Sequence, residues 1–159
     1  MKSGWQTIGR LSYWLTWPAI WLVIRLSPPR TRGIVITDGK ILLLKQWLGP
    51  GNWGLPGGGR GRNESAKQCI IREIKEETGL QIEYFQVKYF KHFNLRENGI
   101  AVDLDCFIVS APGQTSLLLR RPEIVDAGWF TETDMRNVKL SPATQQILSA
   151  LDQNKHLLE

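Results

Sequence analysis

The chain has 159 residues, a length that suits one domain with its own hydrophobic core. Its 42% hydrophobic and 22% charged residues exclude an intrinsically disordered chain and are ordinary for a globular protein. Residues 1–32 hold five of the 20 Lys and Arg and none of the 15 Asp and Glu, so residues 33–159 have a formal charge of zero. With no net charge, residues 33–159 offer no obvious basic surface for the phosphate backbone of a nucleic acid. Nucleic acid is therefore not an expected partner.

Residues 1–29 form an apolar and basic segment that is rich in tryptophan. It holds four of the seven tryptophans, Trp5, Trp14, Trp17 and Trp21. Its apolar run, Leu11 to Leu26, is shorter than the ~20 residues of a membrane span, and no signal-peptide cleavage site follows it. We expect an extra N-terminal helix that packs on the domain or on a second subunit of a homodimer. Peripheral membrane contact is the alternative, because tryptophans with flanking bases favour membrane interfaces.

Pro28-Pro29 closes this segment, and residues 30–159 are expected to form the main domain. Two strands are predicted over residues 33–37 and 41–45, around an Asp38-Gly39 turn. A helix is expected from about Ser65 to Thr78, where Gly79 provides a left-handed cap.

Four further strands are predicted over residues 82–92, 102–109, 116–119 and 124–130. Ser141-Pro142 is typical of a helix start, and the helix is expected to continue to Leu151. Strands on both sides of one internal helix, with a closing helix, predict an α/β fold with a mixed sheet between helices. Cys69 and Cys106 fall in apolar patterns, so both are expected to be core residues of a protein in a reducing, cytoplasmic setting.

The most informative pattern is a glycine turn followed by an acidic helix. Five residues separate Gly58 from Glu64, and a further seven separate Glu64 from Arg72. The run Arg72-Glu73-Ile74-Lys75-Glu76-Glu77-Thr78-Gly79-Leu80 follows at once. Its three glutamates fall at i, i+3 and i+4, on one side of a helix. Like charges repel in this arrangement, and a hard divalent cation bound by oxygen ligands explains them best.

These residues resemble the signature of the Nudix hydrolases, G-x5-E-x7-R-E-U-x-E-E-x-G-U with U apolar. Every fixed position is met, and the preceding Trp53-Gly54-Leu55-Pro56-Gly57-Gly58-Gly59 also resembles the usual approach to this motif. The resemblance implies the α/β/α sandwich of that family. It also implies cleavage of a nucleoside diphosphate linked to another moiety, with Mg²⁺, or Mn²⁺ in its place, as the cofactor.

The resemblance also implies roles for individual residues. The expected metal ligands are the three glutamates and one backbone carbonyl: Glu73, Glu76, Glu77 and Gly57. Arg72 is expected to orient a motif glutamate, and Glu64 to support the loop or reach the metal through water. Gly57, Gly58 and Gly59 would let the backbone approach closely.

The general base remains open between two kinds of residue. Members of the family use either a motif glutamate, here Glu73 or Glu76, or a glutamate from a later loop. The later candidate is Glu123, ahead of Gly128-Trp129-Phe130, with Asp126 as the alternate.

The substrate class is set only broadly. Motifs that mark the NADH, coenzyme A, ADP-ribose and dinucleoside polyphosphate subfamilies are mostly absent, which leaves nucleoside triphosphates or nucleotide sugars as the expected substrates. Three alternatives remain: a nucleotide-sensing module without hydrolysis, a membrane-surface hydrolase of nucleotide-linked envelope precursors, and an RNA 5′-end pyrophosphohydrolase.

Overall fold

The computed structural model describes residues 29–47, 50–97, 100–113, 116–119 and 123–154. The predictions for the Trp-rich segment concern residues that, except for Pro29, lie outside this part. The elements in chain order are β1 (Arg30–Thr37), β2 (Lys40–Gln46), β3 (Trp53–Gly54), α2 (Ala66–Thr78), η1 (Tyr84–Gln86), β4 (Val87–Glu97), β5 (Ile100–Ser110), β6 (Ile124–Phe130), α3 (Glu132–Arg136) and α4 (Pro142–Asp152). None of the helices in these ranges has the length and hydropathy that a membrane crossing requires.

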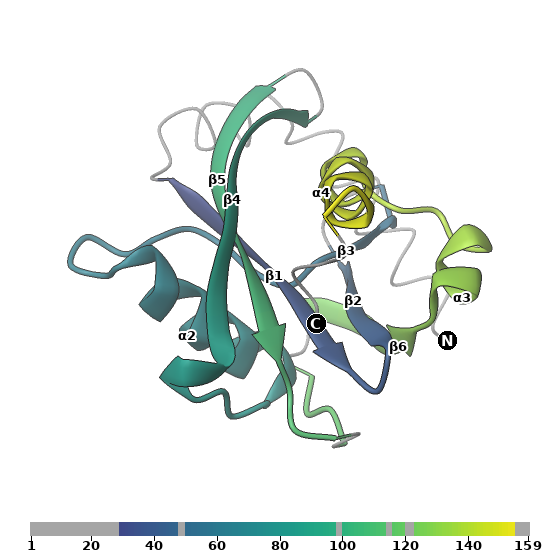
Figure 1. Cartoon of the computed structure of the whole chain (residues 1–159), viewed down its shortest axis with the longest axis horizontal. Helices are drawn as coiled ribbons and strands as arrows, with labels where there is room; N and C mark the ends of the chain where they lie inside the picture. The colour runs from purple at the N-terminus through teal and green to yellow at the C-terminus, as the bar shows by residue number, and fades with distance from the viewer. Residues whose placement is uncertain (1–28, 48–49, 98–99, 114–115, 120–122, 155–159) are drawn as a thin grey trace.

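One mixed sheet runs through the domain in the order β3-β2-β1-β5-β4, and β6 pairs with β2 (Figure 1). β1 and β5 are parallel, and the other neighbours are antiparallel. The β1–β2 hairpin turns at Asp38 and Gly39, whose φ angles of 47° and 69° are those of a type I′ turn, as predicted. β1 and β2 pair only next to this turn, at Ile36–Ile41 and Thr37–Lys40. Beyond it the two strands separate, which leaves one edge of β1 open to a different partner.

Helices α2 and α4 cover opposite faces of the sheet (Figure 1). Side chains alternate between the faces along each strand. In β1, Ile34 packs in the core under α4, whereas Val35 packs in the core under α2. Cys106 belongs to the first core, and Cys69 on α2 is also fully buried, which confirms both as core residues. The predicted α/β/α sandwich is confirmed.

Local hydrogen bonds set both ends of α2 where the sequence predicts them. Ser65 is the N-cap, and its side chain accepts from the Gln68 N–H while the Gln68 side chain accepts from the Ser65 N–H. Gly79 ends the helix at φ 76° and donates its N–H to the carbonyl of Lys75. The helix that carries the acidic run is therefore fixed in length by its own sequence.

Two strand predictions are wrong. Residues 82–86 do not begin β4: they contain η1, in which Gln86 accepts from the Glu83 N–H and donates to the carbonyl of Ser110. These bonds satisfy the backbone locally, so β4 begins only at Val87. Residues 116–119 are not a strand either, because the Leu118 N–H donates to the carbonyl of Thr78, at the end of α2, instead of joining the sheet. The short elements β3 and α3 were not predicted.

Replacing Ile147 by alanine tests how far the fold depends on the α4 face. Ile147 is fully buried in the core under α4. We expect Ile147→Ala to lower the free energy of unfolding by about 2–5 kcal/mol, because a cavity replaces the lost side chain. Gln146→Ala, on the exposed side of the same helix, is the matched control. Urea denaturation measures both, and equal midpoints for the two variants would contradict this account of the core.

Candidate active site

The glycine loop, residues 56–59, runs along the open edge of β1. The Thr31 N–H donates to the carbonyl of Gly58 at 2.8 Å, and the Gly33 N–H donates to the carbonyl of Pro56 at 2.9 Å. Gly57 lies between these bonds, so its own N–H and carbonyl point away from β1. Its φ is 136°, and a Cβ there would lie 2.2 Å from the carbonyl oxygen of Thr31. Only glycine fits this position.

The loop meets α2 at two of the predicted metal ligands. The Gly57 N–H donates to Glu77 Oε2 at 2.9 Å. A Cβ on Gly58 would lie 2.5 Å from Glu73 Oε1, so the Glu73 carboxylate packs directly against the loop backbone. Burial raises the pKa of Glu77 to about 7, although the bond from Gly57 and the charge of Arg32 oppose the rise. Loop and helix thus bring the motif glycines and glutamates together.

Arg72 is the centre of an ion-pair network. Its Nε and Nη2 donate to the two carboxylate oxygens of Glu64 at 2.8 and 2.9 Å, a bidentate arrangement. Its Nη1 donates to Glu73 Oε1 at 2.8 Å and to Glu76 Oε2 at 3.3 Å. The hydrogen bond from Arg72 lowers the pKa of Glu64 to about 2, and those carboxylates in turn raise the pKa of Arg72.

This network ties the helix to the loop as well. Glu64 Oε2 accepts from the Gly61 N–H at 2.9 Å, and Arg72 Nη2 donates to the carbonyl of Gly59 at 3.2 Å. Arg72 and Glu64 therefore lie where orienting and loop-supporting residues would be needed. Their roles stay predictions.

The donor set fits a hard divalent cation in its chemistry. Glu73, Glu76 and Glu77 offer carboxylate oxygens, and Gly57 offers a carbonyl on the adjoining loop, which are the ligands that Mg²⁺ and Mn²⁺ prefer. In the described residues, however, no three acidic, His or Cys side chains converge closely enough to hold a metal ion. Arg72 occupies the space between Glu73 and Glu76 and compensates their charge.

Glu123 and Asp126 have different surroundings. Glu123 lies just before β6, and the Trp47 N–H donates to its carbonyl at 2.9 Å. Its charge adds to the rise in the pKa of Glu77, so the two carboxylates lie within electrostatic range of each other. Asp126 is within β6 and accepts from the N–H of its own neighbour, Ala127, at 3.0 Å. Of the two, Glu123 is the one whose charge acts on a motif glutamate, and its role as a base stays a prediction.

Arg32 was not predicted to be a site residue, yet its side chain reaches the same loop. Its Nη1 donates to the carbonyl of Gly57 at 2.7 Å, the group predicted to bind metal. Side chains alternate along β1, so Arg32 is expected on the face of the strand opposite to Thr31. The course of residues 56–59 beside β1, however, could not be predicted from the sequence. Asp103 and Asp105 on β5 contact Asn94 and His92 on the neighbouring strand β4.

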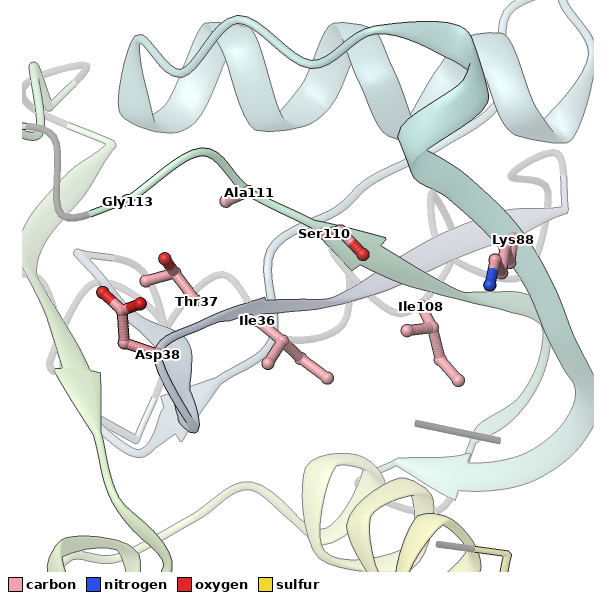
Figure 2. Close-up of a pocket in the computed structure, with 8 residues that line it drawn as sticks. All are labelled: Ile36, Thr37, Asp38, Lys88, Ile108, Ser110, Ala111 and Gly113. Atoms are coloured by element: carbon pink, nitrogen blue, oxygen red, sulfur yellow. The ribbon is translucent and has the colours of Figure 1, made fainter. Parts of the chain in front are cut away.

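One surface depression of about 300 Å³ lies away from these residues. Figure 2 shows its lining, which comes from the ends of β1 and β5 and from Lys88 on β4. The glycine loop contacts β1 at residues 30–33, whereas the depression contacts it at residues 36 and 37. No motif glutamate lines it, so it is not part of the candidate active site.

The chain is similar to known proteins over most of its length. It matches the NUDIX domain family over residues 27–151. It is 30% identical over 129 residues to the Nudix hydrolase YvcI of Bacillus subtilis (strain 168), covering 80% of this chain and 81% of the relative.

Two solved structures share the fold. The MutT NUDIX hydrolase of Burkholderia pseudomallei superposes with a TM-score of 0.67 at 26% identity, over 77% of this chain and 95% of the other. A bifunctional NMN adenylyltransferase/ADP ribose pyrophosphatase from Francisella tularensis, complexed with AMP and a Mn ion, gives a TM-score of 0.71 at 21% identity. That match covers 91% of this chain and 47% of the other. With the full motif in place, this chain belongs to the Nudix family and is a diphosphate hydrolase of the Nudix type.

Proposed function

We propose that this chain is a metal-dependent pyrophosphohydrolase that cleaves a nucleoside diphosphate linked to another moiety. A nucleoside triphosphate or a nucleotide sugar is the substrate class that we favour. The observation that carries the proposal is the contact of the glycine loop with α2, through the bond from Gly57 to Glu77 and the packing of Glu73 on Gly58. It brings the loop backbone against two of the motif glutamates, which a merely solvated acidic helix would not do.

Glu73, Glu76, Glu77 and the Gly57 carbonyl would hold the cation. When bound, a divalent cation neutralises phosphate charge and lowers the pKa of a coordinated water. Glu123 would take the proton of the attacking water. As the water oxygen bonds to phosphorus, the bridging P–O bond breaks, and the leaving phosphate group carries away the electron pair of that bond. Two phosphate-containing products result.

Arg72 would act through its neighbours rather than on the substrate. Its Nη1 contacts both Glu73 and Glu76, and its other nitrogens are fixed by Glu64. Side chains anchored in this way lose little entropy when they orient a ligand. Arg72 therefore positions the two carboxylates, and Glu64 positions Arg72.

The first test compares wild type with Glu76→Gln on a panel of nucleoside triphosphates, nucleotide sugars and ADP-ribose. We expect phosphate or pyrophosphate release by the wild type with Mg²⁺ or Mn²⁺, and a loss on the order of 10²-fold or more in the variant. Glu132→Gln on the exposed helix α3 should keep full activity. If folded wild type binds a nucleotide but turns over no panel member, a nucleotide-sensing module replaces this proposal.

Metal removal gives a second test. We expect a chelator to abolish turnover, and an excess of Mg²⁺ or Mn²⁺ to restore it, because the carboxylates offer only oxygen ligands for hard cations. Titration calorimetry with Mn²⁺ should also show binding that Glu77→Gln weakens. Turnover that persists in the chelator after dialysis would contradict the proposed cofactor.

The general base is tested by Glu123→Gln against Asp126→Asn. A positioned base contributes roughly 10²- to 10⁴-fold, so we expect kcat to fall by that factor in Glu123→Gln and to change little in Asp126→Asn. Pre-steady-state turnover over a range of pH separates the chemical step from product release. An unchanged kcat in Glu123→Gln would move the assignment to a motif glutamate.

A further inference from the structure

Arg32 reaches the active-site loop from the face of the sheet opposite to the motif glutamates. Side chains alternate along β1, so Arg32 shares a face with Ile34, which packs under α4. On the next strand its register partner is Cys106, which belongs to the same core. Glu73, Glu76 and Glu77 come from α2, on the other face. The two sets of charges meet at the glycine loop, because that loop fills the open edge of β1.

In the part of the chain that the structure describes, Arg32 makes its contacts through one of its three nitrogens. Nη1 donates to the carbonyls of Gly57 and Thr31, at 2.7 and 3.2 Å. Within the described residues, Nε and Nη2 donate no hydrogen bond, and the side chain forms no ion pair. These two nitrogens form one edge of the planar guanidinium. That edge is the geometry with which arginine binds two oxygens of a phosphate or a carboxylate.

The position of the side chain favours a ligand role over a structural one. Arg32 is half-buried, so part of its charge is removed from water. A cation in such a place is stabilised by an anion, and the described residues place none in contact with it. Its two carbonyl contacts fix the guanidinium at the loop and leave one edge that bonds to none of the residues described. Arg72 differs in this respect, because all three of its nitrogens donate to carboxylate oxygens.

We infer that Arg32 binds a phosphate group of the substrate through its Nε–Nη2 edge while its Nη1 holds the Gly57 carbonyl. The inference rests on the proposed function, since it assumes a diphosphate at the glycine loop. It adds a contact from the side opposite to the carboxylates, so the phosphates are held between α2 and β1. The residue is a substrate-binding group that also fixes the loop. This role explains why the half-buried Arg32 forms no ion pair with a motif glutamate.

The test uses Arg32→Gln and Arg32→Lys in the full chain, with Arg136→Gln on the exposed helix α3 as control. Glutamine keeps a donor for the Gly57 carbonyl but loses the charge, and lysine keeps the charge but loses the planar edge. For the substrate found with the panel, we expect KM to rise on the order of 10- to 100-fold in Arg32→Gln. Arg32→Lys should recover only part of this loss. The control, Arg136→Gln, should have the same KM as the wild type.

A second readout does not depend on turnover. Calorimetric titration with inorganic pyrophosphate, in chelator, should show binding to wild type and to Arg136→Gln that is lost in Arg32→Gln. Equal pyrophosphate binding by folded wild type and Arg32→Gln would overturn the inference, even in an active enzyme. So would a loss confined to kcat and to Mn²⁺ affinity, because Arg32 would then act only through the Gly57 carbonyl. If the wild type is inactive on the panel but binds pyrophosphate in a way that requires Arg32, the proposed function is wrong and the inference about Arg32 stands.

Discussion

The site depends on the backbone pairing of residues 56–59 with β1. Two hydrogen bonds, from Thr31 to Gly58 and from Gly33 to Pro56, turn the N–H and carbonyl of Gly57 away from the strand. The N–H then meets Glu77 on α2, and the carbonyl meets Arg32 on β1. This pairing is possible because β1 and β2 separate beyond their hairpin. A side chain at Gly57 would overlap the carbonyl of Thr31, so the whole arrangement requires glycine there.

The concentration of negative charge on α2 has a cost that the structure offsets in two ways. Glu77 is buried and takes a hydrogen bond from Gly57, yet burial still raises its pKa to about 7. Glu73 and Glu76 share the positive charge of Arg72, which Glu64 holds in place through a further ion pair. Such a cluster is poorly suited to stability alone, since apolar residues would pack with less desolvation. The proposed divalent cation would supply further positive charge at this cluster.

Most of the fold could be predicted, because its signals are local. Ser65 and Gly79 fix the ends of α2, Asp38-Gly39 fixes the first hairpin, and Ser141-Pro142 starts α4. The errors occurred where tertiary contacts override local preference. Gln86 bonds to the end of β5 and delays β4, and Leu118 docks on the last turn of α2 although its neighbours have strand propensity. Strand pairing is decided by which edges are available, and β6 already occupies the outer edge of β2.

The sequence by itself determined the family, the acidic face of α2 and the need for glycines in the loop, because spacing along a helix and backbone freedom are properties of the chain alone. Only the tertiary structure decided which groups face these glutamates. It brought Glu64 to Arg72, brought Glu123 into electrostatic range of Glu77, and carried Arg32 across the edge of β1 to the Gly57 carbonyl. These residues are far apart in the chain. Their separation in space is set by the pairing of the strands with one another and of residues 56–59 with β1.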